Sequence, residues 1–455
     1  MIYVLFMPFQ YNLTKLIVPL NWLFALFPIS FILGNLIINL HIVLIVIIGC
    51  IYLNKKKLKL NNKFPILIFF IFCVILIISS FYNQANIEKS FLFLRVIIFY
   101  YIGVILLKEK EFNFGIVFNI FSIIVIIISL DLIFQYFTGY NIIGLEIKKY
   151  IKNNLDAGAT SFFNNESVAG SFLLNFGFFL IYKIFMTFKR KTVKNEIIKS
   201  LLVAIVGIGI FVSSQRIPMI FWILFLTIYG IVFYKSKLKI ILFSFIILSL
   251  FIISFSSANE RLRYVSFYDN AKSIIERTSM VYYTNKNDKK LEQTKLDLKK
   301  QNLLKEKNLE FVKGSGHANL FGNGIFIWGK NKFLGIGYKN FYIKCAEYKL
   351  LRCSTHPHNY YLDVLVTVGL LGLAVLIIYL FFITFRSFQY LKIYYDKKKS
   401  NHFDLLLIFL INFLIIFFPL KSSGSFFTTS NITHTIIILV LLNSRIDKKF
   451  FKKLN

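Results

Sequence analysis

The chain has 455 residues, of which 57% are hydrophobic and 16% charged, and its formal net charge is +32 at pH 7. An apolar share this large exceeds what a soluble core needs, so the composition excludes an ordinary soluble enzyme and indicates an integral membrane protein. The positive charge does not indicate nucleic-acid binding, because basic cytoplasmic loops produce the same balance and no recognition module accompanies it.

Apolar segments long enough to cross a hydrocarbon core of about 30 Å recur along the whole chain. We predict twelve spans, at residues 15–32, 36–53, 64–82, 91–107, 114–138, 166–186, 198–214, 217–234, 238–256, 359–384, 403–419 and 431–444. The first span is expected to remain as a helix and not to be a cleaved signal peptide, because it is far from a small-residue cleavage signature and another span follows at once.

The predicted fold class is therefore an all-α polytopic integral membrane protein, with about twelve transmembrane helices and one large periplasmic loop. Residues 1–256 are expected to form an N-terminal membrane domain of about nine helices. Residues 257–358 form the loop, which is partly helical, and residues 359–455 form a C-terminal membrane domain of about three helices with a cytoplasmic tail.

Short-loop charge predicts the orientation, because lysine and arginine stay on the cytoplasmic side. The basic segments fall on one side if both termini are cytoplasmic: "NKKKLKLNNK" (54–63), "KEKEF" (108–112), "FKRKTVKNEIIK" (188–199), "KSKLK" (235–239), "FRSFQYLKIYYDKKK" (385–399) and the tail. The opposite, periplasmic side then receives residues 139–165, "SSQR", residues 257–358 and "SSGSFFTTSN".

Polar residues near the spans are the first candidates for a site. Asp131 and Gln135 in "SLDLIFQYF" are polar residues within a predicted span. Because transporters place such groups at the membrane midplane, this pair leaves a transporter as an alternative. Glu166 lies at the mouth of the sixth span. Arg216 in "SSQRIP" lies at another external mouth, where it is either an interfacial anchor or a bidentate clamp for phosphate.

The 257–358 segment is too long for a simple connector, so function is expected there. Its first part is predicted to form an amphipathic surface helix, and the charged insert 284–310 a solvated helix or mobile insert without a site. In "GIGYKNF" we interpret Gly335 and Gly337 as turn formers, because a dinucleotide site needs a third glycine in a strand-turn-helix unit.

Two cysteines of this segment, Cys345 and Cys353, are eight positions apart. In an oxidising compartment they are expected to form a disulfide just before the histidine motif, although spacing alone leaves two free thiols as the alternative. The serines and threonines of "SSGSFFTTS" (422–430) are expected to cap helices.

The stretch "STHPHNYYLDVLVTVGLLGL" (354–373) places two histidines before an apolar run. Pro357 is predicted to begin the helix, with His356 near the cap and His358 in the first turn. There the unpaired N–H groups and the helix dipole attract phosphate oxygens and favour a neutral imidazole, as a general base requires. The alternative is that both histidines only cap a helix at headgroup level. A metal site is not expected, because the two side chains diverge and Asp363 lies further into the helix.

These residues resemble the O-antigen ligase and polymerase superfamily of bacterial inner-membrane glycosyl-transfer proteins. The resemblance rests on "STHPHNYYLDVLVTVGLLGL", which is similar to the family's histidine-asparagine motif, with support from "FIWGKNKFLGIGYKNF" and "SSQRIPMI". The plan of twelve spans with one large external loop extends the resemblance over most of the chain.

The resemblance implies transfer of a glycan from an undecaprenyl-pyrophosphate carrier to an acceptor at the outer face of the membrane, with no metal and no cofactor. His358 would activate the acceptor hydroxyl and Arg216 would hold the diphosphate. The remaining substrate-binding candidates are His356, Asn359, His317, Glu166 and Lys339. His317 stands near a position where many family members carry arginine, and Gln215 stands where some relatives have an acidic residue.

The predicted function is an O-antigen ligase-like enzyme of the bacterial inner membrane, with lipid A-core as the acceptor, a periplasmic active site and membrane lipids as its surroundings. A polymerase and a protein O-oligosaccharyltransferase of the same superfamily remain alternatives, and a polysaccharide transporter or flippase is the alternative from another class. A purely structural membrane protein would not explain the clustering of His356, His358, Arg216 and Glu166.

Overall fold

The computed structural model describes residues 13–58, 60, 63–147, 158–164, 166–190, 192–233, 237–256, 318–350, 353–396, 400–422 and 424–446. In these ranges the regular structure is helical, and the nearest feature to a strand is one isolated bridge between Tyr140 and Glu146. The predicted all-α class is therefore confirmed for this part of the chain. The predicted amphipathic helix and the charged insert 284–310 lie outside the described residues.

The N-terminal span is a bent pair of helices, α1 (Leu13–Ala25) and α2 (Phe27–Leu33), whose axes differ by 50°. Pro28 sits in the first turn of α2, where its missing N–H costs nothing and its fixed φ favours a new helix start. The bend therefore follows from the local sequence.

Helices occupy the positions of the other predicted spans. They are α3 (Asn35–Lys56), α4 (Phe64–Tyr82), α5 (Ile87–Leu92), α6 (Arg95–Leu106), α7 (Phe114–Thr138), α8 (Ala169–Thr187), α9 (Val193–Val212), α10 (Arg216–Val232), α11 (Leu238–Phe255), α17 (Tyr360–Asp396), α18 (Ser400–Ile416) and α19 (Thr429–Arg445). Two further helices, α15 (Ala318–Lys330) and α16 (Phe341–Glu347), precede the histidine motif.

Among the described residues, eight helices are long and apolar enough to cross a membrane, or nine if the α1–α2 pair is one span. The apolar helices α10 and α18 have 17 residues each and are shorter than these eight, of which the shortest has 18. The predicted number of twelve spans is thus not confirmed, but the multi-pass character of the chain is.

Large apolar side chains remain exposed along the outside of the bundle. Leu36, Ile47 and Ile51 on α3, and Leu250 and Ile253 on α11, are each at least 44% exposed. Exposed apolar area on this scale is unfavourable in water and is what a helix presents to lipid. The buried faces instead carry aromatic residues, among which Trp222, Tyr52 and Tyr100 are fully enclosed.

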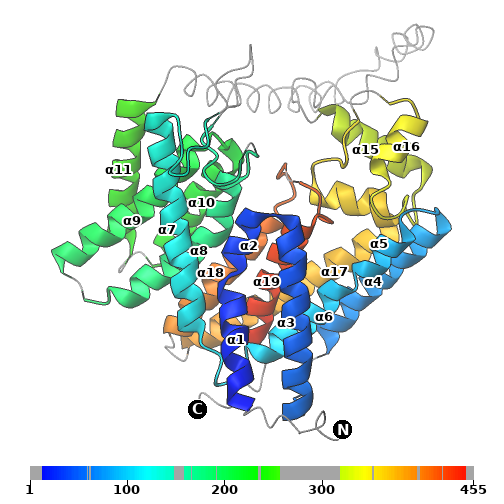
Figure 1. The fold of residues 1–455 in the computed structure, drawn as a ribbon, viewed down its shortest axis with the longest axis horizontal. Coiled ribbons are helices and arrows are strands. Elements are labelled where there is room, and N and C mark those ends of the chain that lie inside the picture. The colour runs from blue at the N-terminus through cyan, green and yellow to red at the C-terminus, as the bar shows by residue number, and fades with distance from the viewer. Residues whose placement is uncertain are drawn as a thin grey trace, which may run out of the picture.

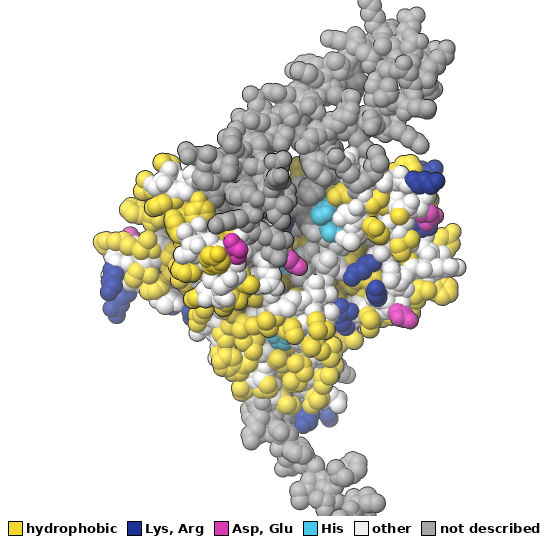
Figure 2. Space-filling model, turned by 45° about the horizontal axis from the view of Figure 1, so that its top comes forward, with side chains coloured by type: hydrophobic (Ala, Val, Ile, Leu, Met, Phe, Trp, Pro, Cys, Tyr) yellow, Lys and Arg dark blue, Asp and Glu magenta, His cyan; other side chains and the backbone are white. Residues whose placement is uncertain are grey.

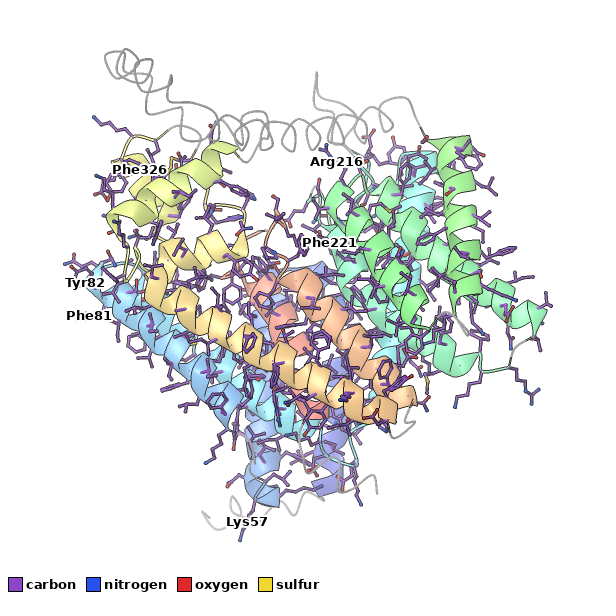
Figure 3. All side chains as sticks on the ribbon, turned by 180° about the vertical axis from the view of Figure 1, so that it is seen from behind. Lys57, Phe81, Tyr82, Arg216, Phe221 and Phe326 are labelled. Atoms are coloured by element: carbon purple, nitrogen blue, oxygen red, sulfur yellow. A yellow bond between two sulfur atoms is a disulfide. The ribbon has the colours of Figure 1, made fainter. Side chains whose placement is uncertain are left out.

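The helices form two groups joined by a central set (Figure 1). One group contains α7 to α11, the other contains α4, α5 and α15 to α17, and α1, α2, α3, α18 and α19 lie between them. Lys57 lies at one end of the bundle and Arg216 at the other (Figure 3). We call the second the histidine end, because the histidine motif, residues 354–359, lies there as well.

The helix α17 is broken at Gly369, whose φ of 67° and ψ of −166° are not helical. Four backbone hydrogen bonds join the break to the preceding loop: Leu370 N to Lys332 O (2.9 Å), Leu371 N to Phe333 O (3.3 Å), Ile336 N to Val366 O (2.9 Å) and Gly337 N to Thr367 O (3.0 Å). Gly335 and Gly337 have φ of 68° and 85°, which confirms their interpretation as turn formers. The predicted span 359–384 is therefore two helical pieces. Residues 332–337, which we call the glycine loop, satisfy the backbone groups that the break exposes.

Candidate functional site

The helix that follows the histidine motif begins at Tyr360, so the prediction that Pro357 starts it was wrong. Asn359 is the residue before the helix, and its Oδ1 accepts a hydrogen bond from the backbone N–H of Leu362 at 3.1 Å. Asparagine is a strong N-cap because its side chain satisfies an otherwise unpaired donor of the first turn. His358 is thus outside the first turn, with a left-handed φ of 58°.

The two histidines of the motif lie side by side. Their ring centroids are 4.2 Å apart, and the Nδ1 atom of His356 lies 2.9 Å from the Oγ1 atom of Thr355. Both side chains are half-buried. Figure 2 turns the histidine end toward the viewer and shows histidine side chains at its surface, near basic ones. Contrary to the expected divergence, the turn brings both imidazoles to one place.

Asn359 also fastens the turn between α18 and α19, residues 417–428, which we call the last turn. Its Nδ2 donates to the carbonyl oxygens of Pro419 at 2.8 Å and Lys421 at 3.2 Å. The oxygen and the nitrogen of the Asn359 amide therefore join the start of α17 to the last turn.

A buried carboxylate makes the second link to the last turn. Asp363 accepts hydrogen bonds from Ser425 Oγ at 2.6 Å and Phe426 N at 2.9 Å. Thr428 stands at the N-cap of α19, but its hydroxyl donates to Ser425 O at 3.0 Å. The serines and threonines of this segment were predicted to cap helices, but the Ser425 hydroxyl instead donates to Asp363 of α17. The role of Asp363 was missed, although an acidic residue in a first helical turn is a signal for such contacts.

Arg216 is the first residue of α10, beside the start of α8. The Oε1 atom of Gln215 accepts from Ser171 N at 2.6 Å and from Ser171 Oγ at 3.1 Å, so the two helix starts are joined. Glu166 is exposed in the turn before α8. In the described part of the chain there is no ion pair between Glu166 and Arg216.

The last turn also contacts the helix that carries Arg216. On α10, Phe221 packs against Phe418, with ring centroids 5.2 Å apart, and Lys421 Nζ lies 5.8 Å from the Phe221 ring centroid. Figure 3 shows Arg216 near the start of α10 and Phe221 further along the same helix. The last turn thus touches both α10 and the histidine motif, which are far apart in sequence.

Lys339 lies beside the same region. Its Nζ is 5.5 Å from the ring centroid of Tyr338, and the Tyr338 hydroxyl donates to Phe427 O of the last turn at 3.3 Å. Partial desolvation and the charges of Lys89 and Arg95 lower the pKa of Lys339, and Asp363 opposes them. Several cations therefore lie close together here.

A small apolar core supports the loop that leads to the histidines. Ile327 of α15, Phe341 and Cys345 of α16 and Val366 of α17 are buried together. Cys345 and Cys353 form a disulfide whose Cα atoms are 5.9 Å apart. The disulfide and this core hold the chain just before His356. His317 lies outside the described residues.

Asp131 and Gln135, the polar pair that suggested a transporter, form hydrogen bonds within the protein. Asp131 accepts hydrogen bonds from Ile142 N at 2.8 Å and from the Ser161 hydroxyl. Gln135 Oε1 accepts from Thr160 N at 2.9 Å and Ser161 N at 2.8 Å. Both buried side chains therefore anchor the loop after α7.

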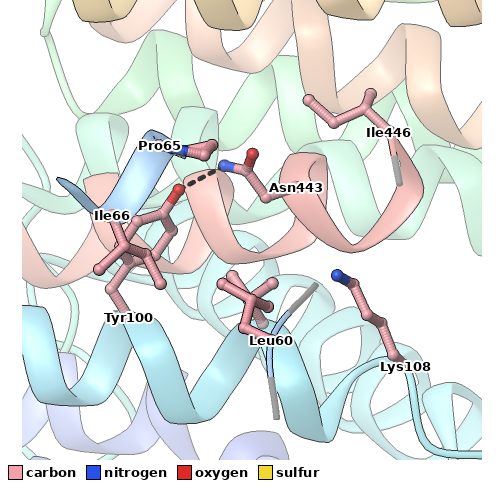
Figure 4. Close-up of a pocket in the computed structure, with 8 residues that line it drawn as sticks. Leu60, Pro65, Ile66, Tyr100, Lys108, Asn443 and Ile446 are labelled. Atoms are coloured by element: carbon pink, nitrogen blue, oxygen red, sulfur yellow. Dashed lines mark hydrogen bonds between the residues drawn. The ribbon is translucent and has the colours of Figure 1, made fainter. Parts of the chain in front are cut away.

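A pocket with room for about one water molecule lies at the opposite end of the bundle (Figure 4). It is lined by residues that include Tyr100, Lys108 and Asn443, and Asn443 Nδ2 donates to the Tyr100 hydroxyl at 2.6 Å. It is too small and too far from the histidine motif to belong to the candidate site. In the described part of the chain there is no group of three or more His, Cys, Asp or Glu residues that could hold a metal ion.

The fold and the histidine end define a multi-pass helical membrane protein with imidazole and guanidinium groups at one end of its bundle. Residues 201–377 match the family model described as O-antigen ligase, a segment that contains Arg216 and the histidine motif. This match supports the resemblance to the O-antigen ligase and polymerase superfamily. No curated protein matches the chain. At a coarse level, the match supports an enzyme of the glycosyltransferase type whose substrates are lipid-linked glycans.

Proposed function

We propose that the protein is an O-antigen ligase-like glycosyltransferase that moves a glycan from undecaprenyl pyrophosphate to a lipid A-core acceptor at the periplasmic face of the inner membrane. The observation that supports it most is the last turn, which contacts both the helix of Arg216 and the residue after His358. These contacts support a shared role for a permanent cation and a pair of imidazoles at this end of the bundle.

His358 acts as the general base in the proposed reaction. It accepts the proton of the acceptor hydroxyl while the hydroxyl oxygen forms a bond to the anomeric carbon of the donor glycan. The bond between that carbon and the pyrophosphate oxygen breaks on the opposite face, so the configuration inverts. The proton on the imidazole then passes to water.

Arg216 stabilises the leaving group in this scheme. Negative charge builds on the pyrophosphate oxygen as its bond to carbon breaks, and a guanidinium can bind two such oxygens at once. His356 touches the ring of His358 and orients it. Lys339, Glu166 and His317 are proposed contacts for the glycan or its carrier, and Asn359 acts by positioning the motif. The scheme needs neither metal nor cofactor.

The test is transfer by the purified protein in proteoliposomes, with an undecaprenyl-pyrophosphate-linked glycan and lipid A-core, both lipids being followed by gel. We expect His358→Ala to reduce the rate by about 10²–10⁴-fold, as loss of a general base does. Arg216→Ala should reduce it by about 10²–10³-fold, as loss of an electrostatic contact does. Lys344→Ala, at an exposed ion pair of α16, is the control and should retain activity.

The products distinguish the alternatives. Glycan on lipid A-core identifies a ligase, longer glycan on the carrier a polymerase, and glycan on an added acceptor protein a protein O-oligosaccharyltransferase. Movement of the glycan across the bilayer without any transfer would replace the proposal by a transporter. Full activity of His358→Ala would remove that histidine from its role.

A further inference from the structure

Lys421 is a cationic residue of the last turn that the sequence did not single out. Its backbone is held in place, because its N–H donates to Phe418 O at 3.1 Å and its carbonyl accepts from Asn359 Nδ2 at 3.2 Å. Its side chain is half-buried and lies near Phe221 of α10, five residues after Arg216. The ammonium is therefore located between the arginine helix and the histidine motif.

Among the described residues, no acidic side chain neutralises Lys421. It forms no ion pair with any carboxylate in the described ranges, and the nearby Asp363 is engaged by Ser425 and Phe426. Burial lowers the pKa of Lys421 to about 8. A half-buried ammonium without a carboxylate is unfavourable, so an anionic ligand would stabilise this arrangement.

We propose that Lys421 binds the pyrophosphate of the carrier lipid together with Arg216, approaching it from the last turn. This inference rests on the proposed function, because that function supplies a pyrophosphate at this end of the bundle. A carrier pyrophosphate bears more than one negative charge, and a single guanidinium leaves part of it uncompensated. A flexible ammonium on the neighbouring turn supplies the second positive charge.

Binding should be measured first without an acceptor, so that catalysis does not enter. The probe is undecaprenyl pyrophosphate, titrated into the purified protein in phosphatidylcholine nanodiscs. Lys421→Gln should weaken binding by about 10- to 100-fold, the range expected for one charged hydrogen bond. Lys421→Arg should bind nearly as well as the wild type. Lys332→Gln, at an exposed position of the glycine loop, should not change the affinity.

The pH dependence separates charge from shape. Wild-type affinity should fall above about pH 8, as Lys421 loses its proton, whereas the Lys421→Arg variant should keep its affinity up to about pH 9.5. Of the other charged or titratable groups on the neighbouring elements, His434 of α19 is acted on by the Lys421 charge, and Asp363 of α17 is engaged by Ser425 and Phe426. Arg216 begins α10, and the two histidines precede α17. They are common to both proteins, so the difference reports on position 421.

Each outcome has a separate meaning. Wild-type binding that Arg216→Ala weakens and Lys421→Gln does not would overturn the inference and leave the proposed function standing. Failure of the wild type to bind undecaprenyl pyrophosphate would overturn the proposed function as well. Equal competition by phosphatidylglycerol would mean that Lys421 binds lipid headgroups in general. Competition by inorganic pyrophosphate but not by phosphatidylglycerol would support the proposal that Lys421 binds the pyrophosphate of the carrier. Thermal unfolding of Lys421→Gln and Lys421→Met shows whether a loss of binding reflects loss of fold.

Discussion

A single amide, that of Asn359, connects helix start, histidine motif and last turn. It accepts from Leu362 N and donates to the carbonyl oxygens of Pro419 and Lys421. Because these bonds use both ends of the side chain, the residue beside His358 is fixed relative to the backbone of Lys421. Asn359 thus sets the distance between the proposed base and the proposed anion ligand.

Removal of this amide should disturb both stability and activity. Asn359→Ala is expected to lower the free energy of unfolding by about 1–3 kcal/mol, because a cap and two bonds to carbonyls are lost. Asn359→Asp keeps the cap acceptor but not the donors, so its loss of stability should be smaller while its transfer rate still falls. Thermal unfolding in detergent and the transfer assay measure the two effects. Wild-type rates in both variants would show that the last turn needs no such fastening.

At the scale of the elements, the break of α17 is the feature that places the histidine end. The short first piece of α17 directly follows the motif, and the loop of residues 332–337 holds this piece by backbone hydrogen bonds to the break. Ser79 of α4 adds a hydrogen bond to Thr367 O at 2.9 Å, so three distant segments meet there. A continuous helix would satisfy its own backbone and could not be held in this way.

A side chain on Gly335 should separate these segments. A Cβ atom there would lie 2.5 Å from Val366 O, and the φ of 68° is unfavourable for other residues. Gly335→Val should lower the free energy of unfolding by about 2–4 kcal/mol and abolish transfer. Gly329→Ala is the matched control, because a Cβ atom at Gly329 would meet no other atom within 4 Å. Similar melting temperatures for the two variants would contradict this account.

At the scale of the whole molecule, the bundle has a basic end and a histidine end. Lys57 lies at the first and Arg216 at the second, while exposed apolar side chains cover the helices between them. This distribution suits a chain that crosses a bilayer repeatedly, and in the proposed orientation the cationic loops are cytoplasmic. The proposed reaction requires the histidine end to face the periplasm, where the glycan and lipid A-core meet.

Cysteine labelling tests this orientation. Lys57→Cys and Lys332→Cys, both at exposed positions, are introduced separately in a background with Cys50→Ala and Cys73→Ala. A membrane-impermeant maleimide should label position 332 in intact spheroplasts, and position 57 only after permeabilisation. The reverse pattern would place the histidine end in the cytoplasm and contradict the proposed function.

The sequence by itself predicted the helices well. Helices lie at the positions of all twelve predicted spans, because the free energy of transfer into lipid depends on the residues of each segment alone. The conformation of Gly335 and Gly337 was also predictable from the local sequence, because glycine adopts a positive φ without steric cost. The motifs around Arg216 and His358 also carried the family resemblance without any knowledge of the fold.

The tertiary structure alone decided what gathers around these motifs. Asn359 and Lys421 are 62 positions apart, and Ser79 and Thr367 are 288 positions apart, so no local pattern joins them. The start of α17 at Tyr360 was mispredicted because proline favours a first turn, whereas the cap was decided by an asparagine that also bonds to the last turn. Such contacts depend on how separate helices pack, and packing selects among partners that a local sequence leaves equally possible.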